Sequence, residues 1–242
     1  MEIGIVGFGR FGKLAADYLC KDFKVYVYDR GKTIINSDNK NIIPAAIDKV
    51  CAGDIVILAV PISEFENALL EIKNLLKKGS LVIDVCSVKE RPAKLMEKIL
   101  PKNVQILATH PIFGPDSAKD SVRGRKIVLC KIRISEELYK RIKENLENAG
   151  LIIIEATPEE HDREIANTLL LTHFIGRALI EFGAKELSMD TEGYKRLLKI
   201  LETVRNDTSQ LFKDMSMYNK YSKEMRMRFI KAMLNVNKRL EK

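Results

Sequence analysis

Apolar residues in the first two thirds of the chain form short runs that alternate with helical patterns. This alternation is typical of a mostly parallel sheet wrapped by helices. The runs predict strands at residues 3–6, 25–28, 55–60, 81–86, 104–109, 126–130 and 151–155. Between the first two strands, Phe11, Leu14, Ala15, Tyr18 and Leu19 form one apolar stripe, as a helix packed on a sheet requires. We therefore predict an α/β domain over residues 1–155.

The strand pattern stops after Glu155, and residues 156–242 predict helices only. Thr157 is a suitable N-cap, with Pro158 in the first turn and two acidic residues behind it. From Ile165 to Phe182 this helix is apolar nearly all round, which predicts burial on several sides. Further helices are expected at 191–204 and 221–238. Because three helices alone make a small core, we expect this small all-helical domain to mediate a homodimer.

Composition narrows the class of protein. The 242 residues include 46% hydrophobic and 31% charged residues, enough for a substantial core. We find no signal peptide and no apolar run long enough to cross a bilayer, so no membrane partner is expected. The spacing of the four cysteines fits neither a metal site nor a disulfide framework, which favours reduced thiols and a cytoplasmic location. They are Cys20, Cys51, Cys86 and Cys130.

The formal net charge of +8 raises the question of a nucleic-acid partner. Basic residues are interleaved with acidic ones, and no nucleic-acid-binding motif accompanies them. The densest basic stretch, near the end of the chain, also carries apolar residues at helical spacing, which indicates a helix with a solvated basic face. These are Met225, Phe229, Met233, Val236 and Leu240. We expect no nucleic-acid partner and an anionic small-molecule substrate.

Gly7, Gly9 and Gly12 follow the first predicted strand and open the first helix with GxGxxG spacing. The first glycine permits the tight turn, the second lets the backbone approach a pyrophosphate, and the third allows close helix packing. The helix N-terminus offers free N–H groups to the phosphates. This arrangement predicts a Rossmann-type dinucleotide-binding domain. The expected cofactor contacts are Gly7, Phe8, Gly9, Arg10, Phe11, Gly12, Asp29, Arg30, Val60 and Pro61.

The second predicted strand ends in Asp29, roughly 20 residues after the glycines, where an acid usually bonds the adenine ribose hydroxyls. This position favours NAD. Arg30 follows directly and could stack on adenine or bind a 2′-phosphate, so NADP stays open.

Ligands of an open parallel sheet lie at the carboxyl ends of the strands, where Pro61, Ser87 and His110 stand. A neutral imidazole suits the removal of a hydroxyl proton during hydride transfer, so His110 is the candidate base; a buried structural histidine is the alternative. Ser87 could orient the imidazole or bond the same hydroxyl, and it could also cap a helix starting at Lys89.

Several segments in order resemble the arogenate and prephenate dehydrogenases of tyrosine biosynthesis: GFGRFG, VPISEFE, DVCSVKERP, THPIFGPDS, EEHDREIA and LTHFIGRAL. THPIFGPDS and the later DTSQLFKDMSMYN are most similar to the plant arogenate enzymes. The resemblance implies oxidative decarboxylation of a cyclohexadienol, with His110 as the base and Ser87 as its hydroxyl partner. It implies that His173 faces the substrate pocket. For His161 it leaves two roles open, a structural one and a chemical one.

The resemblance also implies a basic residue late in the helical domain that binds the substrate dianion. Lys213 aligns there, although a lysine gives a point charge in place of the bidentate fork of an arginine; Arg177 and Arg205 are alternatives. The loop after His110 offers Asp116, Ser117 and Asp120 to the substrate. Because an acid near the side chain attracts an α-ammonium, arogenate is favoured over prephenate.

Two other classes fit parts of the pattern. A β-hydroxyacid dehydrogenase would share the glycine loop, but the family uses a lysine on the helix entering the second domain, and residues 162–183 contain none. A non-catalytic NAD(H)-sensing module would have no use for Ser87 and His110 at adjacent strand ends.

Overall fold

The computed structural model describes residues 1–31 and 39–241. By its internal contacts the chain divides into two units, Met1–His161 and Asp162–Lys242. The division falls within the helix that begins at Pro158, whereas the sequence led us to expect it after Glu155.

Within the described residues, the strands of the first unit form one eight-stranded sheet in the order β3-β2-β1-β4-β5-β6-β7-β8. The strands are β1 (Glu2–Val6), β2 (Lys24–Tyr28), β3 (Ile42–Pro44), β4 (Ile55–Leu58), β5 (Leu81–Asp84), β6 (Gln105–Pro111), β7 (Lys126–Arg133) and β8 (Ile152–Glu155). All neighbours pair in parallel except β6 and β7. The Rossmann-type, mostly parallel sheet is confirmed. The short edge strand β3 was not predicted, because three residues ending in a proline carry little pattern.

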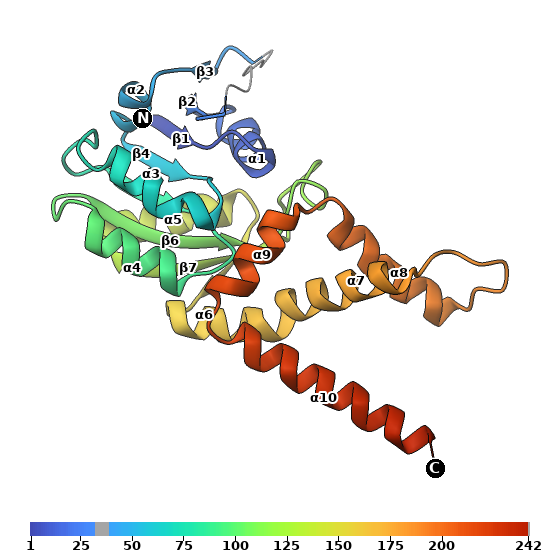
Figure 1. Ribbon diagram of the computed structural model, residues 1–242. Coiled ribbons are helices and arrows are strands. Elements are labelled where there is room, and N and C mark those ends of the chain that lie inside the picture. The colour runs from blue at the N-terminus through green and yellow to red at the C-terminus, as the bar shows by residue number, and fades with distance from the viewer. Residues whose placement is uncertain (32–38, 242) are drawn as a thin grey trace. The chain divides into compact units, whose positions relative to one another are not determined.

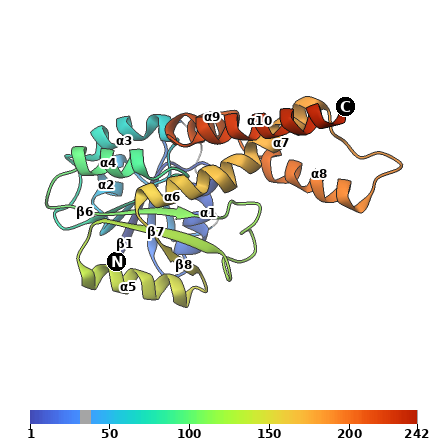
Figure 2. The ribbon, with the colours of Figure 1, turned by 90° about the horizontal axis from the view of Figure 1, so that it is seen from below.

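Helices cover both faces of this sheet (Figure 1). They are α1 (Arg10–Leu19), α2 (Ile47–Cys51), the short 3₁₀ turn η1 (Ile62–Glu64), α3 (Phe65–Ile72), α4 (Glu90–Ile99) and α5 (Glu136–Asn148). Figure 2 shows α3 and α4 on one side of the sheet and α5 on the other. Ala16 of α1 and Cys20, the C-cap that follows this helix, pack with Ile5 and Val27 of the central strands. Phe65 and Leu69 of α3 and Met96 of α4 are buried too, so both faces are apolar, as a parallel sheet buried on both sides requires.

The order of the strands reverses between β1 and β4, and both strands run in the same direction. Connections leave their carboxyl ends on opposite sides of the sheet, which opens a crevice there. Gly7 follows β1 and Ala59 follows β4, so the glycine loop lies at this switch point.

Thr157 begins the helix α6 (Pro158–Ile165) as predicted. Its hydroxyl accepts a hydrogen bond from the Glu160 N–H at 3.2 Å, and the Glu160 carboxylate accepts one from the Thr157 N–H at 2.8 Å. This reciprocal pair is a capping box.

The described residues of the second unit form helices and connecting loops, with no strand among them. A π-helical segment, η2 (Ala166–Leu170), leads into α7 (Leu171–Phe182), α8 (Glu192–Arg205), α9 (Ser209–Tyr218) and α10 (Ser222–Leu240). Gly176 of α7 packs closely on α8, since a Cβ at this position would lie 2.7 Å from Val204. We did not predict α9, whose Thr208 hydroxyl accepts from the Leu211 N–H. None of the described helices is both long and apolar enough to cross a membrane.

Candidate active site

The three glycines of the loop between β1 and α1 differ in their surroundings. Gly7 has a φ of +97°, and a Cβ on it would lie 2.5 Å from the Ala59 carbonyl oxygen. A Cβ on Gly12 would lie 2.1 Å from the Gly7 carbonyl oxygen, so this position permits close packing of helix on strand. A Cβ on Gly9 would meet nothing within 4 Å, so the backbone there is open to a ligand. Because α1 begins with neither a side-chain cap nor an acid in its first turn, its N–H groups suit a pyrophosphate.

Asp29, at the end of β2, is bonded to the same loop. Its carboxylate accepts a hydrogen bond from the Phe8 N–H at 2.6 Å and another from the Gly31 N–H at 2.9 Å. Arg30 forms an ion pair with Glu71 of α3, and its guanidinium lies 3.7 Å from the Glu64 carboxylate. The acid is thus fixed beside the glycine loop, while the neighbouring arginine is bound by two carboxylates.

His110 and His161 form a buried pair at the carboxyl end of β6. Their Nδ1 and Nε2 atoms, respectively, are 2.8 Å apart, and the two residues are 5% and 3% exposed. Burial, then the neighbouring His161, then the Lys89 ammonium hold the pKa of His110 well below its usual value. The imidazole of His110 is therefore neutral near neutral pH. Its Nε2 makes no hydrogen bond within residues 1–31 and 39–241.

Ser87 is half-buried in the loop between β5 and α4 and makes no hydrogen bond among the described residues. The helix begins at Glu90 with Lys89 as its N-cap and without a side-chain cap bond, so Ser87 does not cap it. The hydroxyl does not contact His110, whose Nδ1 is taken by His161. Sequence reasoning placed His161 in the EHD motif but not at this contact, since the pair is far apart in the chain.

The loop after β6 folds onto the nucleotide-binding helix. Asp116 forms an ion pair with Arg10 at 2.6 Å, and the Tyr18 hydroxyl donates to the Ala118 carbonyl oxygen at 2.8 Å. Ser117 bonds back to Gly114 within the loop. Asp120 is exposed and makes no hydrogen bond or ion pair with any residue that the structure describes. The predicted Asp116 and Asp120 thus lie in different surroundings, and only the first is bound.

His173 and Arg177 form a separate polar cluster in the helical unit. The His173 Nε2 lies 3.4 Å from the Asp207 carboxylate, and burial, partly offset by Asp207, lowers the pKa of His173. The Arg177 Nη2 donates to the Asp207 carbonyl oxygen at 2.6 Å, and its guanidinium lies 5.7 Å from the centre of the Phe212 ring. His173 Nδ1 and Arg177 Nε are buried and have no partner within the described chain. Lys213 and Arg205 are exposed.

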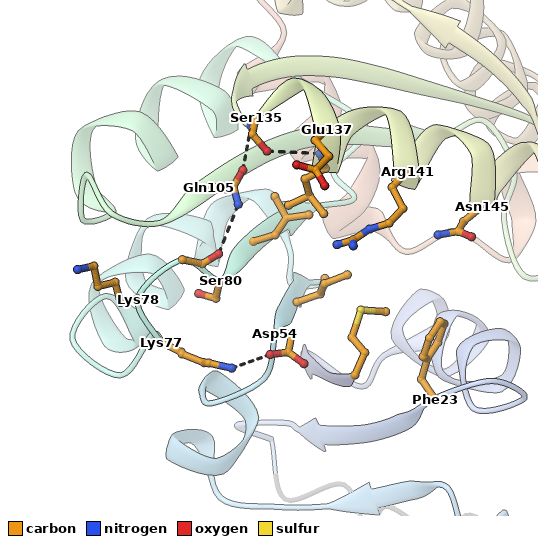
Figure 3. A pocket seen from close by; sticks show the side chains of 15 residues that line it. Phe23, Asp54, Lys77, Lys78, Ser80, Gln105, Ser135, Glu137, Arg141 and Asn145 are labelled. Atoms are coloured by element: carbon orange, nitrogen blue, oxygen red, sulfur yellow. Dashed lines mark hydrogen bonds and ion pairs between the residues drawn. The ribbon is translucent and has the colours of Figure 1, made fainter.

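A cavity of about 880 Å³ lies at the opposite, amino end of the parallel strands. Asp54, Ser80 and Gln105 line it from the starts of β4, β5 and β6, and Arg141 lines it from α5 (Figure 3). Lys77 on its rim is paired with Asp54 at 2.7 Å. None of the candidate catalytic or cofactor residues contributes to this cavity.

Comparisons with known proteins show which family the chain belongs to. Residues 18–155 match the family described as prephenate dehydrogenase, nucleotide-binding domain, and residues 178–242 match the TYRAAT1-like, C-terminal domain. Arogenate dehydrogenase 2, chloroplastic, of Arabidopsis thaliana is 33% identical over 99% of this chain and 70% of its own length. The chain belongs to the prephenate and arogenate dehydrogenase family. It is accordingly an NAD(P)-dependent dehydrogenase, as the sequence motifs led us to expect.

Other members of this family match over most of the chain. A probable arogenate/prephenate dehydrogenase of Methanocaldococcus jannaschii is 31% identical over 95% of this chain and 54% of its own length. The fold is that of the prephenate dehydrogenase of Aquifex aeolicus, whose structure was solved with hydroxyphenyl propionate and NAD+. The TM-score is 0.76 at 22% identity, covering 98% of this chain and 90% of the other.

Proposed function

We propose that the protein oxidatively decarboxylates arogenate to tyrosine with NAD, and that prephenate is its second substrate. The observation that carries this proposal is the buried, neutral His110 beside the loop that packs on the nucleotide-binding helix. A base that loses its proton below neutral pH, at the carboxyl end of a strand, fits proton removal from a hydroxyl.

His110 Nε2 takes the proton of the ring hydroxyl. For this, the Nδ1 of His110 carries its own proton and donates it to the Nε2 of His161, which fixes the tautomer. When bound, the oxidised nicotinamide accepts the hydride from the same ring carbon. The bond between the ring and its carboxylate then breaks, carbon dioxide leaves, and the electron pair stays in the ring, which becomes aromatic.

Ser87 suits the role of second partner of the ring hydroxyl. Its own hydroxyl is half-buried at the neighbouring strand end and is not used by any described residue. A serine that bonds the alkoxide oxygen as negative charge develops there would stabilise the transition state.

Asp120 supports arogenate as the preferred substrate. Its carboxylate is exposed and lacks a partner among residues 1–31 and 39–241, in contrast to Asp116, which Arg10 neutralises. An α-ammonium near Asp120 would be attracted, whereas the 2-oxo group of prephenate would not. Two Arabidopsis relatives are named arogenate dehydrogenases.

The surroundings of Asp29 and Arg30 support NAD. The carboxylate of Asp29 is fixed at the end of β2, where it meets adenine ribose hydroxyls in dinucleotide-binding domains. Arg30 would have to leave Glu71 and Glu64 to bind a 2′-phosphate.

The helical unit supplies hydrogen-bond donors for the substrate carboxylates. Lys213 is the residue aligned with this role, and Arg177 and His173 offer buried polar atoms that no described residue bonds. A half-buried arginine with a buried, unused Nε–H is better suited to a carboxylate than an exposed lysine. We therefore favour Arg177 and His173 over Lys213 and Arg205.

A homodimer through the helical unit is part of the proposal. In α10 the apolar stripe begins against its own unit, since Met225 is buried and Phe229 packs on Phe174, with ring centres 6.3 Å apart. The same stripe continues into Met233, Val236 and Leu240, which are 58%, 55% and 81% exposed. A second copy would cover this continuation. Sedimentation at micromolar concentration tests it: a monomer alone would contradict the dimer. The buried, free cysteines support a cytoplasmic location.

The function is tested by mixing the protein separately with arogenate or prephenate and with NAD or NADP. The appearance of reduced cofactor and of the aromatic product is followed. We expect the highest kcat/KM for arogenate with NAD and no turnover in the His110→Gln variant. Absence of reduced cofactor in all four mixtures would refute the proposed function.

A further inference from the structure

Lys89 and Asp84 form an ion pair that is completely buried beneath the candidate site. Both side chains are 0% exposed, and the Lys89 ammonium bonds the Asp84 carboxylate. Removing two charges from water carries a large desolvation cost, which is why a buried pair is weak evidence of a role in stability. The position of this pair in the site therefore needs another explanation.

The two residues together bind every polar group of Thr109, which directly precedes His110. The Asp84 carboxylate accepts a hydrogen bond from the Thr109 N–H at 3.2 Å, and the Asp84 carbonyl oxygen accepts one from the Thr109 hydroxyl at 2.7 Å. The Lys89 ammonium donates to the Thr109 carbonyl oxygen at 2.5 Å. The peptide groups on both sides of Thr109 are thus held, one by Asp84 and the one that leads to His110 by Lys89.

Asp84 also accepts a hydrogen bond from the Cys86 N–H at 3.0 Å, which shapes the loop that carries Ser87. The same ion pair therefore sets the backbone at the ends of both β5 and β6. These are the two strand ends that bear the candidate base and its candidate hydroxyl partner.

The Lys89 charge also acts on the imidazole itself. The causes that lower the pKa of His110 are burial, His161 of α6 and Lys89 of the loop between β5 and α4. Asp84 of β5 is the carboxylate bound to Lys89, and the residue opposite His110 on β7 is the apolar Val128. The Lys89 cation therefore contributes to the lowered pKa of His110.

We propose that the Lys89–Asp84 pair is a positioning device for His110: it fixes the peptide before the imidazole and places the Lys89 ammonium near the ring. The role in catalysis rests on the proposed function, while the hydrogen bonds of the pair to Thr109 and the electrostatic effect of Lys89 on His110 do not. Lys89 acts through His110 and is a positioning residue.

The test compares Lys89→Met with Lys77→Met, which removes the same charge from an exposed pair at the other end of the sheet. The His110 ring is titrated by nuclear magnetic resonance, and its signal is assigned by its loss in His110→Gln, since the chain has three histidines. In Lys89→Met we expect the midpoint of the His110 titration to rise by roughly half a pH unit or more. In Lys77→Met this midpoint should stay unchanged. The acidic limb of kcat/KM should move to higher pH by the same amount, with the KM for the cofactor unchanged.

An unchanged His110 midpoint in Lys89→Met would overturn the proposal. Because the Met variant leaves Asp84 unpaired and can fail to fold, the double variant Lys89→Met with Asp84→Asn is measured as well. A rise in the same direction is expected in it, smaller because the Asp84 charge is lost too. A rise in the midpoint without any turnover of arogenate or prephenate would support the positioning device and refute the proposed function. The two failures are therefore distinguishable.

Discussion

The Nδ1 of His110 and the Nε2 of His161 are 2.8 Å apart, with the two rings inclined at 70° and their centres 5.0 Å from each other. One ring nitrogen of this pair must donate and the other must accept. Only the arrangement in which His110 donates leaves its Nε2 unprotonated for a substrate hydroxyl. With His161 as the acceptor, the pair would set the tautomer of the candidate base, as a carboxylate does in hydrolases of the serine type.

Loss of the acceptor at position 161 should impair catalysis more than folding. We expect kcat/KM to fall roughly 100-fold or more in His161→Phe, because the Nδ1 proton of His110 then has no acceptor. In the control His161→Gln an amide oxygen can still accept, so the fall should be about tenfold smaller. Equal kcat/KM in the wild type and His161→Phe would show that the pair does not orient the base.

Acid should destabilise the first unit through His110. Its folded pKa lies well below the usual 6.5, so between these values the unfolded chain binds a proton that the folded chain does not. The free energy of unfolding is therefore unaffected by this group above about pH 7 and falls below it, by up to about 1.4 kcal/mol per pH unit. Urea unfolding at a series of pH values should show a shallower fall in His110→Gln. An identical pH dependence in both proteins would contradict this assignment.

The glycine loop offers a matched pair of substitutions. Gly9→Ala places its methyl group in open space, so we expect unchanged thermal stability but at least roughly tenfold weaker NAD binding, because the backbone no longer approaches the pyrophosphate. Gly12→Ala places the same group 2.1 Å from the Gly7 carbonyl oxygen and should lower the melting temperature. Calorimetric titration with NAD and thermal unfolding distinguish the two. Tight NAD binding by Gly9→Ala would remove this loop from the cofactor site.

Asp29 should govern the choice of cofactor. In Asp29→Ser we expect the ratio of kcat/KM for NAD to that for NADP to fall by about tenfold or more, since the carboxylate bonds ribose hydroxyls and repels a 2′-phosphate. Glu71→Gln, which weakens the hold on Arg30, should change the ratio in the same direction by improving NADP use. If Asp29→Ser keeps the wild-type ratio, the preference has another origin.

The two acids of the loop after β6 should have separable effects. Asp120→Asn is expected to lower the preference for arogenate over prephenate by about tenfold, because it removes the charge that would attract the α-ammonium. Asp116→Asn breaks the ion pair with Arg10 and should change the KM for the cofactor while leaving the substrate ratio near that of the wild type. Steady-state kinetics with both substrates measures this. A substrate ratio that responds only to Asp116→Asn would reverse the assignment.

Much of the fold follows from local pattern. The strands, the capped start at Thr157 and the glycine loop were predicted because each depends on residues that are neighbours in sequence. The edge strand β3 was missed because it has only 3 residues. The 10-residue helix α9 was missed although it is as long as α1 and begins with the capping residue Thr208. The predicted continuous helix after Thr157 is interrupted by a π-helical segment at Ala166–Leu170, which its apolar pattern did not indicate.

The sequence by itself determined the sheet, the nucleotide-binding loop, the family and the candidate base, because short-range motifs and periodicity carry them. Only the tertiary structure decided the partners of that base. His161 reaches His110 across 51 positions of chain, Lys89 reaches the carbonyl before it across 20, and Arg10 reaches Asp116 across 106. Contacts of this kind depend on how separate strand ends meet at one edge of the sheet, and no local pattern records them.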